Sequence, residues 1–176
     1  MPTSSVIMMT EIAELFCRVN PATVLDIGVG FGRNGAIFRE AADARWGRCR
    51  PDQWQCKIDG VEVFAQYNNP QWGVYDRVFI EDIRTFVKKP FDYEFIFLGD
   101  VLEHLPQKDA ANLIFTLRYA AKKCLAICLP LGHSPQDAMF GNKAEQHVSV
   151  WQEEDFRGFK KILKGKKGLF YIMTDE

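Results

Sequence analysis

Four residues near the start of the chain could form a ligand-binding turn. Asp26, Gly28, Gly30 and Gly32 stand at alternate positions, after an apolar run that begins at Thr23. Glycines at this spacing let the backbone turn sharply and approach a ligand without interference from a Cβ atom. A carboxylate at the end of a buried strand is costly unless it has a partner. The combination indicates a turn that binds a ligand with a cationic group.

The glycine spacing separates this turn from the dinucleotide-binding turn of dehydrogenases. Their pattern, Gly-x-Gly-x-x-Gly, would place its third glycine at position 33, where this chain has Arg33. The third glycine is Gly32 instead, and the carboxylate of Asp26 would oppose a pyrophosphate. An NAD-dependent oxidoreductase is therefore an alternative against which these residues argue. A strand-to-helix turn without a ligand would need neither the carboxylate nor all three glycines.

Acidic residues also stand at the ends of three later apolar runs. These are Glu62, Asp82 and Asp100. Taken singly, each could be an ordinary acid at the end of a strand. Asp100 could also form a helix capping box with Glu103.

Two histidines could act as general bases. His104 follows the fourth apolar run, and His147 lies in a long polar segment, residues 133–151, that we expect to form a lid over the site. An imidazole titrates near neutrality and can accept a proton from a hydroxyl or an amine. The alternatives are an orienting role for His104 and simple packing of the lid for His147 and Trp151.

The first turn resembles the first motif of the class I S-adenosylmethionine-dependent methyltransferases. That motif has the form Asp-x-Gly-x-Gly-x-Gly after an apolar strand, and the match is full at Asp26, Gly28, Gly30 and Gly32. The resemblance implies that these four residues bind S-adenosylmethionine as a cofactor, with the carboxylate suited to the ammonium of its methionyl group.

The same resemblance implies roles for two of the later strand ends. Glu62 would accept hydrogen bonds from both ribose hydroxyls of the cofactor, because a carboxylate offers two acceptor oxygens. Val63 and Phe64 would lie beside the adenine. Asp82 would accept a hydrogen bond from the adenine amino group, and Ile83 would pack on the ring.

The segment from Asp100 to Pro106 resembles the turn after the fourth strand in many small-molecule methyltransferases. The resemblance implies that Asp100 lies near the methionyl end of the cofactor, with Val101 beside it, and that the next residues line the acceptor cavity. His104 and His147 are then the candidate catalytic bases. No Asn-Pro-Pro-Tyr sequence follows the fourth strand, which argues against methylation of DNA adenine.

The elements that position these residues follow from the pattern of apolar residues. Apolar runs alternate with amphipathic segments, which predicts an α/β, Rossmann-like, doubly wound and mainly parallel sheet of about seven strands. The last strand is expected to be antiparallel, in a C-terminal hairpin. The predicted strands are residues 23–29, 58–64, 77–83, 95–99, 124–129, 161–163 and 169–173. The predicted helices are residues 5–19, 34–44, 108–122 and 151–159, with an irregular insertion at residues 45–55.

Length and charge limit the possible partners. The chain has 176 residues, 47% of them hydrophobic, which suits a single domain over residues 1–176 with its N-terminal helix within residues 1–20. A formal net charge of −1 provides no basic field for nucleic acid. A lysine-rich stretch near the C-terminus is interpreted as a solvated hairpin edge rather than an RNA contact. Its members are Lys160, Lys161, Lys164, Lys166 and Lys167.

Neither a membrane partner nor a metal is expected. The first ten residues contain no Lys or Arg, and no apolar stretch approaches the length of a membrane-spanning helix, so we expect a cytoplasmic protein. The five cysteines are interpreted as structural, since Cys49 and Cys56 lack a second pair of ligands at zinc-site spacing.

These observations predict S-adenosylmethionine-dependent methyl transfer by in-line displacement to an unidentified small-molecule acceptor. The reaction needs alignment and a dry site, and it requires neither a nucleophilic residue nor a metal. Little chain is left for a substrate-recognition domain, which favours a small acceptor or a partner that supplies specificity. The alternative is a non-catalytic sensor or subunit that binds the cofactor. The sequence does not indicate the oligomeric state.

Overall fold

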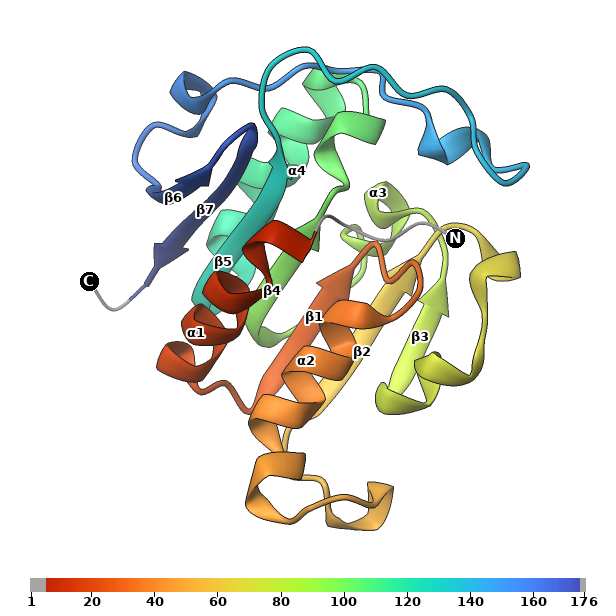
Figure 1. Cartoon of the computed structure of the whole chain (residues 1–176), viewed down its shortest axis with the longest axis vertical. Helices are drawn as coiled ribbons and strands as arrows, with labels where there is room; N and C mark the ends of the chain where they lie inside the picture. Colours follow the sequence, from red (N-terminus) through yellow and green to blue (C-terminus); the bar gives the residue numbers. More distant parts are fainter. Residues whose placement is uncertain (1–5, 175–176) are drawn as a thin grey trace.

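A computed structural model describes residues 6–174, which form a seven-stranded sheet with helices on both faces (Figure 1). The strand order is β3-β2-β1-β4-β5-β7-β6; β1 to β5 are parallel, and β7 is antiparallel to both of its neighbours. The predicted mainly parallel sheet with an antiparallel hairpin is confirmed. The strands are β1 (Thr23–Ile27), β2 (Lys57–Glu62), β3 (Arg77–Ile80), β4 (Tyr93–Gly99), β5 (Ala121–Pro130), β6 (Lys160–Lys164) and β7 (Lys167–Met173).

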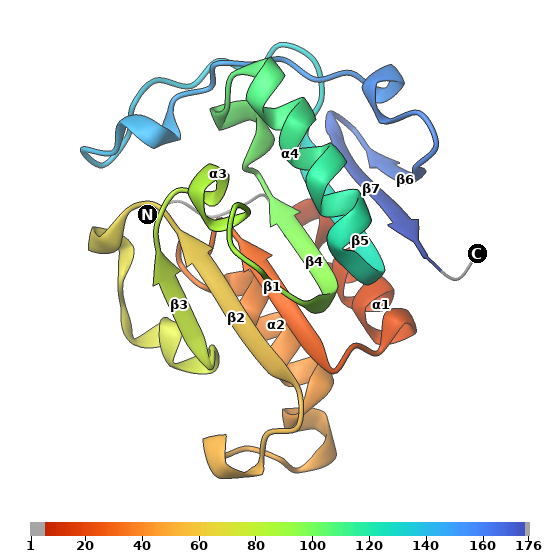
Figure 2. The same ribbon diagram turned by 180° about the vertical axis from the view of Figure 1, so that it is seen from behind.

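Two helices cover each face of the sheet. Helices α1 (Met9–Val19) and α2 (Arg33–Ala42) lie on one face, and α3 (Ile83–Phe86) and α4 (Gln107–Ala120) lie on the other (Figures 1 and 2). No helix within residues 6–174 is both long and apolar enough to cross a membrane. Short 3-10 turns connect these elements, at Val6–Met8, Ala44–Trp46, Pro51–Gln53, Ala65–Tyr67, Pro70–Val74, Leu102–His104, Lys143–Glu145 and Glu153–Phe156.

Strand β4 is an almost uninterrupted run of apolar residues because both of its faces are buried. Phe95 and Phe97 belong to the core under α1 and α2, whereas Ile96 and Leu98 belong to the core under α3 and α4. All four side chains are fully buried. A strand that is covered on both faces cannot alternate apolar and polar residues, and the continuous apolar run follows from this.

Several of the predicted boundaries are wrong; β1 and β2, for example, end at Ile27 and Glu62 rather than at residues 29 and 64. Strand β3 ends at Ile80 rather than at residue 83, because Asp82 accepts a hydrogen bond from the backbone of Arg84 and caps α3. The predicted helix 108–122 ends at Ala120, since the next residue already pairs with β4. The predicted helix 151–159 is only the four-residue 3-10 turn Glu153–Phe156. Residue 5, where the first helix was predicted to begin, lies outside the described residues.

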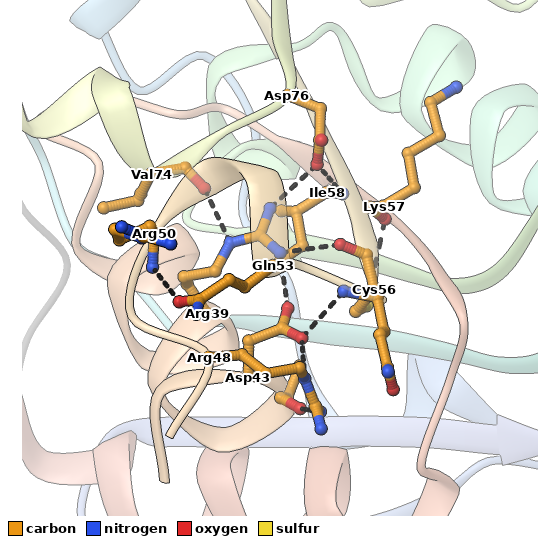
Figure 3. A network of polar contacts seen from close by, with 12 residues as sticks. Arg39, Asp43, Arg48, Arg50, Gln53, Cys56, Lys57, Ile58, Val74 and Asp76 are labelled. Atoms are coloured by element: carbon orange, nitrogen blue, oxygen red, sulfur yellow. Dashed lines mark hydrogen bonds and ion pairs between the residues drawn. The ribbon is translucent and has the colours of Figure 1, made fainter. Parts of the chain in front are cut away.

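The insertion between α2 and β2 is held by a buried polar network (Figure 3). The guanidinium of Arg39 donates to Asp43 at 2.6 Å and to Asp76 at 2.8 Å, and Asp76 also accepts from the backbone of Ile58 at 2.7 Å. Arg39 donates further to the carbonyl oxygens of Cys56 and Val74. The network therefore fixes α2 to the start of β2 and to the segment before β3.

Candidate functional site

A cavity of about 520 Å³ opens at the carboxyl ends of the parallel strands, and the segment that follows β5 forms part of its wall. Its volume lies within the usual range for small-molecule sites. Ten of the thirteen residues predicted to bind the cofactor or to act as bases line it: Gly28, Gly30, Glu62, Val63, Asp82, Ile83, Asp100, Val101, His104 and His147. The other three, Asp26, Gly32 and Phe64, are not among the lining residues.

The glycine turn has a backbone that other residues rarely adopt. Gly28, Gly30 and Gly32 have φ angles of 79°, 51° and 92°, all in the left-handed region. Gly32 ends the turn as the N-cap of α2 and packs beside Gln71 and Trp72. The indole of Trp72 donates to the carbonyl oxygen of Gly30 at 2.9 Å. The alternate spacing of the glycines is thus a consequence of the turn geometry.

Glu62, at the end of the neighbouring strand β2, is hydrogen-bonded to this turn. Its Oε2 accepts from the backbone N–H of Gly30 at 2.8 Å, and its Oε1 accepts from the N–H of Phe64 at 3.0 Å. The residue is only 5% exposed, and burial raises the pKa of its carboxyl. Each oxygen keeps a lone pair for a ligand in the cavity.

Asp26 lies behind the turn rather than in the cavity wall. It is fully buried, and its Oδ2 accepts from the hydroxyl of Tyr75 at 2.6 Å. That hydroxyl accepts in turn from the N–H of Gly35 at 3.1 Å. Burial raises the pKa of Asp26 to about 7. The structure therefore gives Asp26 a phenol as partner instead of a cation. Phe64 also turns aside and packs against Tyr67.

The end of β3 contributes a mixed polar and apolar wall. Asp82 pairs with Arg84 at 2.6 Å, and this guanidinium holds the pKa of the Asp82 carboxyl below its usual range. Ile83 is buried in the core under α3 and still reaches the cavity wall. Val63, from the end of β2, is 48% exposed and adds apolar surface.

Asp100 and Glu103 do not form a capping box. Asp100 has a φ of 55°, a left-handed conformation that aspartate tolerates, and it forms an ion pair with Lys167 of β7. Glu103 is 2% exposed, and within residues 6–174 neither of its carboxylate oxygens has a hydrogen-bond partner. Burial and the nearby charge of Asp100 raise the pKa of Glu103 well above its usual range.

His104 and His147 lie together in the wall of the cavity, although they are far apart in the sequence. Their ring centroids are 4.8 Å apart, in an edge-to-face arrangement. The Nδ1 of His104 lies 3.2 Å from the carbonyl oxygen of Gln146, and the Nδ1 of His147 contacts the carbonyl oxygen of Ser134. Burial lowers the pKa of His104.

Three solved methyltransferase structures are similar to this fold over nearly its whole length. An O-methyltransferase family protein from Burkholderia thailandensis has a TM-score of 0.67 at 13% identity, over 93% of this chain and 54% of that one. The 1,6-didemethyltoxoflavin-N1-methyltransferase of Burkholderia thailandensis, with bound 1,6-didemethyltoxoflavin and S-adenosylhomocysteine, has a TM-score of 0.64 at 13% identity, over 95% and 78%. Magnesium protoporphyrin IX methyltransferase from Synechocystis PCC 6803, with bound S-adenosylmethionine, has a TM-score of 0.59 at 14% identity, over 94% and 78%. The chain has the class I methyltransferase fold.

The likeness to these methyltransferases is one of structure. No protein-family model matches the chain, and no curated protein matches its sequence. The chain spans about half the length of the first of the three neighbours. At identities of 13% to 14%, the comparison supports the fold.

Three residues in or behind the cavity wall were not predicted from the sequence. Lys167 was interpreted as part of a solvated hairpin edge, but it is buried against Asp100. Tyr75, the partner of Asp26, has no recognisable motif around it. Glu145, from the predicted lid, accepts from the hydroxyl of Tyr67 at 2.9 Å, which ties the lid to the segment after β2. Such pairings join distant segments, so no local spacing indicates them.

Replacing Gly28 with alanine is expected to cost more than the same change at Gly47. Both glycines have nearly the same φ, 79° and 80°, but a Cβ on Gly28 would lie 2.5 Å from Cγ2 of Val101, whereas a Cβ on Gly47 would meet nothing within 4 Å. The backbone strain is therefore matched, and only the contact differs. We expect Gly28→Ala to lose about 1–3 kcal/mol more unfolding free energy in urea denaturation. Equal losses would show that Val101 moves aside freely.

Proposed function

We propose that this chain transfers a methyl group from S-adenosylmethionine to a small-molecule acceptor. The observation that carries the proposal is the hydrogen bond between the N–H of Gly30 and the carboxylate of Glu62. It joins the glycine turn to the acidic end of β2 in the wall of one cavity. A ligand with a diol and a flat apolar ring would meet both features together.

The residues present fit the cofactor. Glu62 offers two fixed acceptor oxygens for the ribose hydroxyls, while Val63 and Ile83 supply apolar surface for the adenine. The glycine turn allows close approach of the methionyl part, next to Asp100 and Val101. When bound, S-adenosylmethionine supplies a methyl group already activated by the positive charge on sulfur. The protein then needs chiefly to align the acceptor and exclude water.

The acceptor side of the cavity is built from His104, His147 and the lid. Because the Nδ1 atoms of both histidines contact carbonyl oxygens, each ring carries its proton on Nδ1 and keeps Nε2 free to accept one. Met139 and Phe140 of the lid are partly exposed and line the same cavity. A small acceptor with an apolar body and a hydroxyl or amine would suit this wall. The neighbour with bound 1,6-didemethyltoxoflavin, a small molecule, supports that size class.

Calorimetry with S-adenosylmethionine and S-adenosylhomocysteine tests the proposal. We expect the wild type to bind both, and Glu62→Gln to weaken binding about 10- to 100-fold, because a charge-assisted acceptor is lost. Glu40→Gln is the matched control, since Glu40 is exposed on α2 and does not line the cavity. Absence of binding by a folded wild type would refute the proposal. Binding without turnover on a panel of hydroxyl and amine acceptors would favour the non-catalytic alternative.

A further inference from the structure

The strongest feature that methyl transfer alone does not explain is the carboxylate of Glu103. It is buried, and in the described part of the chain it has no hydrogen-bond donor. Its neighbourhood contains a second carboxylate, Asp100, but Lys167 contributes a single positive charge, which is paired with Asp100. Burying an ionised carboxylate without a partner is costly. Either Glu103 holds a proton and donates it to Asp100, or a cation completes the site.

Two histidines lie beside Glu103, and each has a ring nitrogen that could serve as a ligand. His104 and His147 both direct Nδ1 at backbone carbonyl oxygens, those of Gln146 and Ser134. A carbonyl oxygen can only accept, so in the neutral rings the proton lies on Nδ1 and the lone pair on Nε2. Histidines that bind metals show the same arrangement, in which the second ring nitrogen donates to a carbonyl or a carboxylate.

We propose that Glu103, His104 and His147 bind a divalent first-row transition metal ion. One potential ligand atom from each residue lies within 4.8 Å of those of the other two. Ligands of a tetrahedral ion with bonds of about 2.0–2.2 Å lie roughly 3.4 Å apart, so modest rotations of the side chains would close the site. Two imidazoles with one carboxylate suit zinc, manganese, iron or cobalt, whereas magnesium and calcium prefer oxygen ligands.

Hydrogen bonds hold the backbone around these three residues in place. The carbonyl oxygen of Glu103 accepts from the N–H groups of Val148 and Ser149, at 2.8 and 3.1 Å. The hydroxyl of Ser149 donates to the carbonyl oxygen of Leu102 at 3.0 Å. These bonds clamp the turn that carries Glu103 and His104 to the segment that carries His147. A fixed scaffold of this kind is what a metal site requires.

The position of the site suggests what the ion would do, and this step rests on the proposed methyl transfer. All three ligands line the cavity, so coordination positions left open by the protein face the acceptor side. An oxygen of the acceptor could occupy one of them, which favours a hydroxyl-bearing acceptor. The assignment departs from the sequence-based expectation of no metal. It also excludes a base role for a histidine whose Nε2 holds the ion.

Manganese binding to the metal-free protein tests the site without cofactor or acceptor. Free Mn²⁺ is followed by electron paramagnetic resonance during titration of the chelator-treated full chain. We expect one equivalent to bind the wild type, and Glu103→Gln and His147→Gln each to weaken binding at least about 10-fold. His133→Gln is the matched control, because the third histidine of the chain lies on the same segment but outside the cavity wall. Its affinity should equal that of the wild type.

The outcomes separate this proposal from the proposed function. No stoichiometric binding by the wild type would overturn the metal site, and so would equal binding by the wild type and both ligand variants, which would place the ion elsewhere. Circular dichroism checks that each variant is folded, and the wild-type titration stands even if a variant is not. Manganese binding without binding of S-adenosylmethionine would support the metal site and refute the cofactor proposal; the reverse result would do the opposite.

Discussion

Replacing Asp43 with alanine is expected to lower the free energy of unfolding by about 3–5 kcal/mol, because it removes one of the two carboxylates that pair with the buried guanidinium of Arg39. The carboxylate of Asp43 is fully buried and accepts from Arg39 at 2.6 Å, from Arg48 at 2.7 Å and from the backbone of Gln55 at 2.9 Å. Its loss would remove an acceptor from three donors at once. For a chain of this length, the melting temperature should fall by roughly 6–20 °C.

The control for this change is an exposed ion pair in the same insertion. Arg50 and Asp52 pair at 3.4 Å with side chains that are about 70% exposed. Such pairs contribute about 0–1 kcal/mol, so Asp52→Ala should be close to neutral. Urea denaturation of the wild type and both variants measures the two differences. Similar small losses for Asp43 and Asp52 would show that water replaces the buried network without cost.

The network at Asp43 also bears on the site. Through Arg39 it links α2, which begins at the glycine turn, to the first residues of β2, which ends at Glu62. The turn and the acid must keep their mutual position for the bond between Gly30 and Glu62 to form. The insertion therefore supports the cavity from the opposite end of the sheet.

Local patterns were sufficient to predict the parts of the fold that depend on nearest neighbours. The continuous apolar run of β4 follows from burial on both faces, and the glycines at positions 28, 30 and 32 follow from three left-handed φ angles. Glu62 lies at the carboxyl end of β2, which is why its position in the cavity could be predicted. In each case the signal and its cause lie within a few residues.

Pairings between distant segments could not be predicted in the same way. Lys167 belongs to a lysine-rich stretch, and only the register of β7 against β5 brings it to Asp100. Asp100 and Glu103 have the spacing of a capping box. The backbone of Asp100 is left-handed, however, and the Asp100 side chain pairs with Lys167 instead. Likewise, the ring of His147 meets His104 because the segment after β5 is hydrogen-bonded, through Val148 and Ser149, to the carbonyl oxygen of Glu103. Such contacts are set by tertiary structure and have no local signature.

Asp26 combines both kinds of information, and its ionisation can be measured. Its motif is local, but its partner Tyr75 comes from the segment before β3. Burial, reinforced by the charge of Glu62, raises the pKa of Asp26 to about 7, although the hydrogen bond from Tyr75 lowers it. The folded chain therefore holds a proton on Asp26 at pH values where the unfolded chain has lost it. The stabilisation is complete below about pH 4 and is lost as the pH rises through 7.

We expect the free energy of unfolding of the wild type to fall by about 2–3 kcal/mol more than that of Asp26→Asn between pH 5 and pH 8. The asparagine keeps an acceptor for Tyr75 but has no proton to lose. Tyr75→Phe should extend the decline to higher pH, because removal of the hydrogen bond raises the pKa of Asp26 further. Urea denaturation at both pH values measures the slopes, and parallel slopes for the wild type and Asp26→Asn would contradict the assignment.

Repeating the series with saturating S-adenosylmethionine tests whether the ammonium of its methionyl group lies against Asp26. A cation against Asp26 would flatten the decline, whereas an unchanged decline would leave Asp26 a buried support of the glycine turn.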